Sequence, residues 1–181
     1  MQTNNYKICL TGSQGTGKTT ILNHYRELGY NCITEVVRNL SKQGVPINTM
    51  GTLDGQKRIY EEYQRLFKET DNYISDRGLS DVLAYTIYLA DTNDNEELWK
   101  IAFQQMQLLK EFVKSNPNVQ FFYFPIEFPV VNDGVRSMDE KYRKRIDVII
   151  NALLKFCQIP FITVTGTVEE RIKIIDDAMK S

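Results

Sequence analysis

The segment from Gly12 to Thr19 is the feature of this sequence that most restricts how the chain can fold. It reads GSQGTGKT and fits the pattern G-x-x-x-x-G-K-[ST] at every fixed position. Residues 6–11 before it are typical of a strand, and residues 20–25 after it are typical of a helix. A glycine-rich turn in this setting directs backbone N–H groups at one point, where the helix N-terminus adds partial positive charge. The segment therefore predicts a site for phosphate groups.

The residues of this loop have separate predicted parts in that site. Lys18 is expected to contact the β- and γ-phosphates of a nucleoside triphosphate, and the Thr19 hydroxyl is expected to bind Mg²⁺. The loop and the first helical turn are expected to hold the triphosphate through Gly12, Ser13, Gln14, Gly15, Thr16, Gly17, Lys18, Thr19 and Thr20. We therefore predict ATP and Mg²⁺ as cofactors.

Strand-like and helix-like segments alternate along the rest of the chain. Further strands are predicted at 31–34, 72–75, 119–124 and 160–165. Apolar side chains recur at helical spacing over 53–67 and 146–156. This alternation predicts an α/β fold with a parallel sheet covered by helices on both faces. The length of 181 residues suits one domain, 1–181.

Ligands bind at the carboxyl ends of the strands in such a sheet, so the residues that end the strands are candidates. The second predicted strand ends at Glu35, which is placed to act as a general base on an acceptor hydroxyl. Arg38, one turn later, is available to a phosphate or sugar of the acceptor. The alternative is that Glu35 and Arg38 form an ion pair on the surface.

The third predicted strand ends at Asp76, which is followed by Arg77. The carboxylate is suited to hold Mg²⁺ or to accept the proton of an attacking hydroxyl. Arg77 is suited to pair with a substrate phosphate or to orient the acid. The alternative for Asp76 is to cap the next helix. Tyr85, on that helix, is the aromatic residue that we expect at the substrate, whereas most other tyrosines are expected in the core.

Arginines that follow the fourth predicted strand are candidates for a small lid at about 131–146. The segment Asn132–Ser137 contains a turn signal, and a charged helix is predicted after it. Arginines that close over a transferring phosphoryl group stabilise its charge and exclude water. Arg136 and Arg143 are the candidates, with Arg145 on a flank of the helix, and the alternative is a solvated helix start with an Asp139–Arg143 pair.

The fifth predicted strand leads into Gly166 and Thr167. Thr167 and Glu170 have the spacing of a capping box, and that structural role is enough to explain them. Gly166 and Thr167 are also expected to lie beside the purine base of ATP.

Charge and apolar content exclude several classes of partner. The net charge of −1 provides no general basic field and argues against nucleic acid as a partner. No signal peptide is visible and the apolar runs are too short to span a membrane, so we expect a cytoplasmic protein with no membrane partner. The three cysteines fit neither a disulfide framework nor a zinc site. A homodimer is compatible with the sequence.

These residues resemble those of small P-loop kinases of nucleosides and nucleotides. Asp76–Thr86 is similar to the Asp-Arg-Tyr…Ala-Tyr-Gln signature of thymidylate kinases, with Gly78 and Thr86 in place of its first Tyr and its Gln. Over nearly its whole length, the chain also resembles the AAA-type P-loop domain of bacterial nicotinamide riboside kinases. The similar segments are Thr34–Arg38, Asn132–Ser137 and Val164–Arg171. The resemblance implies a three-layer P-loop fold with five parallel strands in the order 2-3-1-4-5. It also implies ATP with Mg²⁺ and a small-molecule acceptor.

The leading expectation is transfer of the γ-phosphoryl group of ATP to a (deoxy)nucleoside monophosphate, because of the Asp-Arg…Ala-Tyr match. A nucleoside or nicotinamide riboside acceptor is the first alternative, and it would make Glu35 essential. Two further alternatives are a kinase for the 5′-hydroxyl ends of nucleic acid and a P-loop ATPase or switch without a small-molecule acceptor. The low net charge argues against the former, and the lack of an Asp at the end of the strand 119–124 argues against the latter.

Overall fold

The computed structural model of this chain describes residues 6–34, 36–129 and 139–180. Its centre is a sheet of five parallel strands in the order β2-β3-β1-β4-β5. The strands are β1 (Lys7–Thr11), β2 (Cys32–Ile33), β3 (Tyr73–Asp76), β4 (Val119–Tyr123) and β5 (Phe161–Thr163). The predicted α/β fold and strand order are confirmed.

The two outer strands are shorter than predicted. The segment 31–34 contributes only Cys32–Ile33, and the segment 160–165 contributes only Phe161–Thr163. Each pairs on one side, β2 with β3 and β5 with β4. A strand at the edge of a sheet has half of the backbone partners of an inner strand, so its ends leave the ladder earlier than the periodicity predicts.

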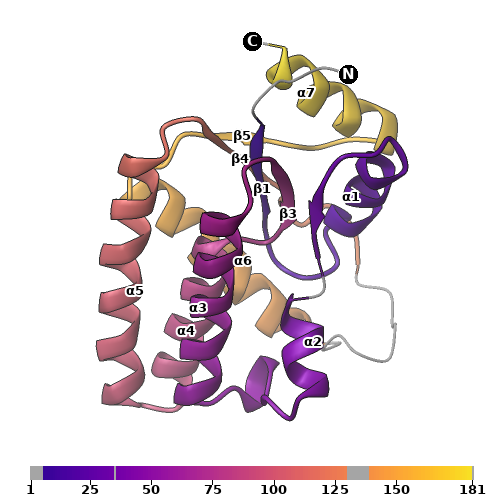
Figure 1. The fold of residues 1–181 in the computed structure, drawn as a ribbon. Coiled ribbons are helices and arrows are strands. Elements are labelled where there is room, and N and C mark those ends of the chain that lie inside the picture. The colour runs from indigo at the N-terminus through magenta and orange to yellow at the C-terminus, as the bar shows by residue number, and fades with distance from the viewer. Residues whose placement is uncertain (1–5, 35, 130–138, 181) are drawn as a thin grey trace.

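Seven α-helices and a short 3-10 helix, η1 (Asn48–Met50), lie within the described residues. The α-helices are α1 (Lys18–Glu27), α2 (Val36–Lys42), α3 (Leu53–Glu69), α4 (Leu79–Thr92), α5 (Glu96–Ser115), α6 (Glu140–Phe156) and α7 (Val168–Met179). Figure 1 shows α1 and α7 on one side of the sheet and α3, α4, α5 and α6 on the other. The predicted layers of helix, sheet and helix are therefore present.

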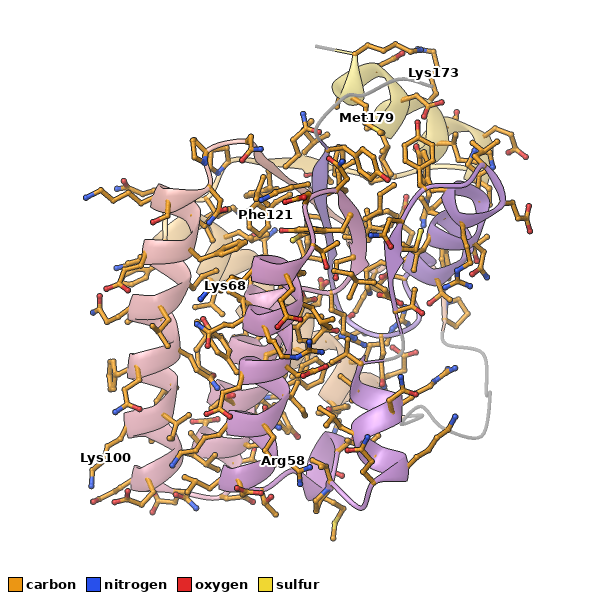
Figure 2. All side chains as sticks on the ribbon, viewed as in Figure 1. Arg58, Lys68, Lys100, Phe121, Lys173 and Met179 are labelled. Atoms are coloured by element: carbon orange, nitrogen blue, oxygen red, sulfur yellow. The ribbon has the colours of Figure 1, made fainter. Side chains whose placement is uncertain are left out.

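Alternation along the inner strands sends side chains into two separate cores. In β4, Phe121 and Tyr123 pack with the helices α3 to α6, and Phe122 packs with α1 and α7. Cys9 of β1 belongs to the first core, and its neighbours in the strand belong to the second. This is the pattern of a strand buried on both faces. In Figure 2, Phe121 lies inside the molecule and Lys100 lies at its edge.

Aromatic side chains fill the larger core, as the sequence predicted for most of them. Tyr60, Tyr63, Phe67 and Tyr88 are all buried there. Phe67 stacks on Tyr73 with ring centroids 4.7 Å apart, an arrangement that adds to the burial of apolar surface. These contacts fix α3 against the sheet.

The sheet brings the two main parts of the predicted site together. Strands β1 and β3 are neighbours, and Leu10 lies opposite Asp76 in their register. The loop after β1 and the residues that end β3 therefore emerge side by side at the carboxyl edge, as expected for a ligand site. None of the described helices has the length and apolar content needed to cross a membrane.

Candidate functional site

The loop between β1 and α1 has a backbone that requires glycine at both ends. Gly12 has a φ of 142°, and Gly17 has a φ of 88°, both in a region that favours glycine. A Cβ at Gly12 would lie 2.4 Å from the carbonyl oxygen of Phe124, and one at Gly17 would lie 2.7 Å from Nη1 of Arg171. The close packing of neighbours behind the loop therefore explains these two glycines.

Lys18 lies at the start of α1, and the loop curls around its ammonium group. Nζ donates hydrogen bonds to the carbonyl oxygens of Gly12 at 2.8 Å and Ser13 at 2.7 Å. It also donates to Oγ1 of Thr16 at 3.1 Å. A positive charge is thus held at the helix N-terminus, next to the backbone of a glycine-rich turn. This is the arrangement that binds phosphate in P-loops.

Thr19 and Asp76 meet beside this loop. Oγ1 of Thr19 donates to Oδ2 of Asp76 at 3.0 Å, and Oδ1 of Asp76 is buried with no hydrogen-bond partner in the described part of the chain. The N-cap of α4 is Gly78, so Asp76 does not cap that helix. A hydroxyl and a carboxylate with spare acceptor capacity are oxygen ligands of the kind that Mg²⁺ prefers. The two residues therefore offer oxygen donors that would suit a magnesium ion.

Arg77 forms a unit with Tyr85. Its Nη1 donates to the hydroxyl of Tyr85 at 3.0 Å, and its guanidinium lies 5.2 Å from the centre of that ring. Burial lowers the pKa of Arg77, but Tyr85, Asp76 and Asp81 outweigh that effect, so its pKa is raised and it stays charged. Its φ of 81° is rare for a residue with a side chain, and such conformations cluster at functional sites.

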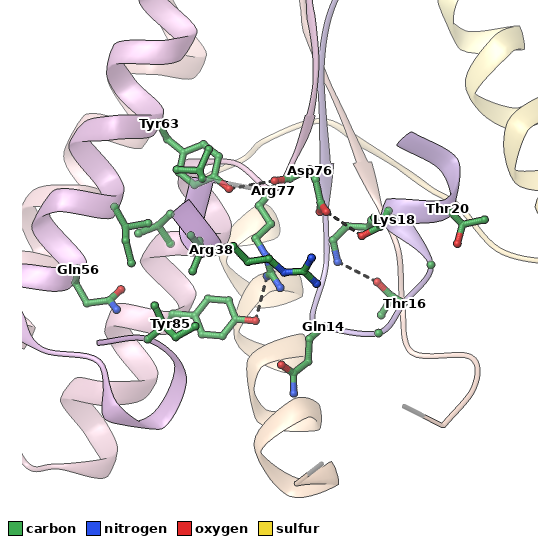
Figure 3. Close-up of a pocket in the computed structure, with 18 residues that line it drawn as sticks. Gln14, Thr16, Lys18, Thr20, Arg38, Gln56, Tyr63, Asp76, Arg77 and Tyr85 are labelled. Carbon is green, nitrogen blue, oxygen red and sulfur yellow. Dashed lines mark hydrogen bonds between the residues drawn. The ribbon is translucent and has the colours of Figure 1, made fainter. Parts of the chain in front are cut away.

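One cavity of about 190 Å³ connects these groups with a largely apolar wall. Residues 14–20 line its phosphate end together with Asp76 and Arg77. The rest of its lining consists of Val36, Val37, Arg38, Ile47, Gln56, Ile59, Tyr63, Val82 and Tyr85. Figure 3 shows Lys18 and Asp76 on one side and Gln56 and Tyr85 on the other, with Arg38 and Arg77 between them. Tyr85 therefore lines the cavity, and its contact with a substrate stays a prediction.

Gln56 on this wall is a site residue that the sequence reasoning did not identify. It lies within the helical segment 53–67, and its buried side chain lines the cavity. Oε1 accepts a hydrogen bond from Oγ1 of Thr86 at 3.1 Å, and this bond orients the amide. The sequence does contain a signal for Gln56, which is a polar residue within an otherwise apolar helix face. A buried amide needs a polar partner, so such a residue indicates a polar contact inside the molecule.

Asp81 is a second residue that was missed, and it anchors the phosphate loop. Its Oδ1 accepts from the N–H of Gly12 at 3.0 Å, and its Oδ2 accepts from the N–H of Gly78 at 3.0 Å. Burial raises the pKa of Asp81 above its usual value, against the opposing influence of Arg77 and Lys18. The carboxylate thus ties the first residue of the loop to the turn that follows β3.

Replacing Asp81 by Asn is expected to lower the free energy of unfolding by about 2 kcal/mol, because an NH₂ group would then face a backbone N–H. Urea unfolding measures the change. The matched control is Asp177→Asn, at an exposed residue paired with Lys173, which should change stability by less than about 0.5 kcal/mol. Equal stability of the two variants would show that Asp81 does not anchor the loop.

Three residues that were predicted to contact ATP or the substrate are not among the residues that line the cavity. The guanidinium of Arg143 is buried against the loop backbone and does not pair with Asp139, which instead caps α6. The N–H of Gly166 donates to the carboxylate of Glu127, 3.2 Å from Oε2. Thr167 forms the predicted capping box with Glu170. Direct contacts of Arg143, Gly166 and Thr167 with substrate or ATP stay predictions.

Two predicted catalytic residues, Glu35 and Arg136, lie outside the described residues, as do residues 130–138 of the expected lid. Val36, which follows Glu35 in the chain, lines the cavity. The roles of Glu35 and Arg136, and the division of the chain into one domain with a lid, stay predictions.

Comparisons with known proteins bear on the family and the fold of this chain. A family model described as "AAA domain" matches residues 7–171. No curated protein matches the chain. A deoxyadenosine kinase from M. mycoides, with the products dCMP and a flexible dCDP bound, has a TM-score of 0.69 and 19% identity, over 96% of this chain and 98% of that one.

The NadR protein in complex with NR has a TM-score of 0.68 and 17% identity, over 98% of this chain and 51% of that one. NadR in complex with NAD and AMP-PNP has a TM-score of 0.70 and 14% identity, over 98% of this chain and 49% of that one. The chain therefore spans about half the length of NadR and nearly the full length of the deoxyadenosine kinase. At these identities the likeness shows the fold.

Proposed function

Because this chain belongs to the AAA domain family, we propose that it uses its P-loop to transfer the γ-phosphoryl group of ATP to a hydroxyl of a nucleoside. The proposal rests chiefly on one observation. A single cavity joins the phosphate loop at one end to a wall of apolar and aromatic side chains at the other. The similar solved structures include a deoxyadenosine kinase and a protein in complex with NR, and this supports an acceptor of the nucleoside class.

The phosphate end of the cavity is assigned to ATP. Lys18 and the loop N–H groups are positioned to bind the phosphates, and phosphoryl transfer depends mainly on such positioning and charge stabilisation. Thr19 and Asp76 would hold Mg²⁺, which supplies further positive charge to the phosphates.

The opposite wall is assigned to the acceptor. The side chains of Val82, Ile59 and Tyr85 offer apolar and aromatic surface to a base, and the oriented amide of Gln56 offers a polar contact. In this position an acceptor would have a hydroxyl directed at the phosphate end. We assign the general base to Glu35, since a neutral hydroxyl must lose its proton during transfer.

A nucleoside is preferred to a monophosphate because of the contacts of Arg77. The expectation of a monophosphate depended on the Asp-Arg…Ala-Tyr match, and here Arg77 donates to the hydroxyl of Tyr85. The contact with Tyr85 explains the spacing of Arg77 and Tyr85 in the sequence, so an acceptor phosphate is not needed to explain it. A (deoxy)nucleoside monophosphate is the second candidate, because Arg38 adds an exposed positive charge to the cavity wall.

An acceptor panel tests the proposal. The protein is incubated with ATP and Mg²⁺ and, in separate reactions, with nucleosides including nicotinamide riboside, with deoxynucleoside monophosphates and with 5′-hydroxyl oligonucleotides. Mass spectrometry is expected to find a phosphorylated nucleoside. A phosphorylated monophosphate would favour the second candidate, and a phosphorylated oligonucleotide would favour a polynucleotide kinase. Release of ADP without any phosphorylated acceptor would contradict the kinase and favour an ATPase.

The substitution Glu35→Gln distinguishes a nucleoside acceptor from a nucleoside monophosphate acceptor. If the acceptor is a neutral hydroxyl, kcat is expected to fall on the order of a hundredfold, with KM for ATP nearly unchanged, because only the base is lost. Glu97→Gln, at an exposed residue paired with Lys100, is the control and should leave kcat unchanged. Near-normal turnover of Glu35→Gln would remove Glu35 as the base.

A further inference from the structure

Two buried arginines from the last two helices hold the phosphate loop from behind. Arg143 of α6 donates from Nε to the carbonyl oxygen of Gln14 at 2.9 Å and from Nη2 to that of Gly15 at 3.1 Å. Arg171 of α7 donates from Nη1 to the carbonyl oxygen of Thr16 at 2.8 Å. Three successive carbonyl groups of the loop therefore accept hydrogen bonds from guanidinium groups.

These bonds determine the direction of the N–H groups that follow. The C=O of one residue and the N–H of the next point in opposite directions across a trans peptide, and the described residues contain no cis peptide. Carbonyls of Gln14, Gly15 and Thr16 that point at the arginines therefore turn the N–H groups of Gly15, Thr16 and Gly17 away from them. Gly15, Thr16 and Gly17 line the cavity, so their donors are directed to the phosphate end.

Both arginines are themselves held in place. The side chain of Arg143 is fully buried and pairs with Glu140, with Nη1 and Oε1 3.1 Å apart. Arg171 pairs with Glu127 and donates from Nε to the carbonyl oxygen of Gly166 at 2.9 Å. Its guanidinium also lies against two aromatic rings, 5.7 Å from the centre of Phe124 and 5.3 Å from that of Phe128. Guanidinium groups fixed in this way are rigid supports for a flexible backbone.

We propose that Arg143 and Arg171 are positioning residues that preorganise the loop N–H groups for the phosphates of a nucleotide. Without them, a loop rich in glycine would be free to rotate its peptides and turn carbonyl oxygens toward the phosphates. Preorganised donors avoid that reorganisation when the anion binds. The inference rests on the proposed function only for its ligand, ATP, and not for the acceptor or for the transfer step.

Arg143→Lys tests geometry apart from charge. Lysine keeps the positive charge, but its single ammonium group does not reproduce the fixed fork that spans two successive carbonyls. Calorimetry with ATP and Mg²⁺, and with inorganic tripolyphosphate, is expected to show affinities about tenfold weaker than for the unchanged protein, as for one lost hydrogen bond to a charged group. Arg65→Lys is the matched control and should bind both ligands normally, because Arg65 is exposed and pairs with Glu62.

Thermal unfolding without ligand distinguishes positioning from a purely structural role. If Arg143 only stabilised the fold, Arg143→Lys would unfold at a lower temperature, yet the folded molecules would bind tripolyphosphate normally well below that temperature. Normal binding would overturn the proposal. Should Arg143→Lys fail to fold, Arg171→Lys undergoes the same measurements with the same criteria. These assays need no acceptor, so they stand even if the panel of acceptors yields no product.

Discussion

Replacing Lys18 by methionine is expected to lower kcat/KM for ATP on the order of a thousandfold, because it removes a charge that stabilises the transferring phosphoryl group. Methionine keeps much of the length and apolar surface of the side chain, so the packing of α1 is preserved. Nζ lies within 2.8 Å of the carbonyl oxygens of Gly12 and Ser13, so the substitution also removes a bond partner from two loop carbonyls. Steady-state kinetics with varied ATP measures the loss.

Lys173→Met is the matched control for Lys18→Met. Lys173 is an exposed residue of α7 that pairs with Asp177, so its loss should leave kcat/KM unchanged. Circular dichroism checks that both variants are folded. A kcat/KM for Lys18→Met within threefold of the unchanged protein, a margin of roughly 0.7 kcal/mol, would show that the ammonium group takes no part in transfer.

Asp76→Asn is expected to lower kcat on the order of a hundredfold and also to shift the Mg²⁺ requirement to higher concentration. Asparagine has the same shape, and its carbonyl oxygen is able to accept the hydrogen bond that Thr19 donates to Oδ2. The substitution therefore removes a charge and leaves the local contacts. Titration of activity with Mg²⁺ at saturating ATP measures both effects.

The control for this substitution is Asp91→Asn, at an exposed carboxylate that pairs with Arg145. It should leave the Mg²⁺ titration unchanged. A titration of Asp76→Asn that overlaid that of the unchanged protein would argue that Asp76 does not bind the ion. In that case the buried Oδ1 would need a different partner.

Arg77 shows how the tertiary structure changed the meaning of a motif. The sequence pairs Arg77 with Tyr85 at the spacing seen in thymidylate kinases, and this favoured a monophosphate acceptor. The structure places the two side chains in contact, 3.0 Å between Nη1 and the hydroxyl oxygen, on the wall of the cavity. The same pattern is then explained by an internal contact, and the preferred acceptor becomes a nucleoside.

Local order in the sequence was enough to predict the sheet, its helices and the phosphate loop. Strand, glycine-rich turn and helix are adjacent in the chain, and the periodicity of apolar residues separates buried strands from amphipathic helices. The positions of Asp76 and Arg77 followed from the rule that ligands bind at the carboxyl ends of parallel strands. Tyr85 lies on the helix that follows those two residues and lines the same cavity, and its contact with a substrate stays a prediction.

The supports of the loop were decided only by the tertiary structure. Arg143 contacts the carbonyl of Gln14 across 129 residues of sequence, and Arg171 contacts that of Thr16 across 155. Such bonds depend on how α6 and α7 are placed against the sheet, and no local pattern encodes that placement. The sequence by itself therefore determined that a phosphate loop forms and where it lies in the sheet. Packing between remote helices decided which groups hold its carbonyls, and so which way its N–H donors point.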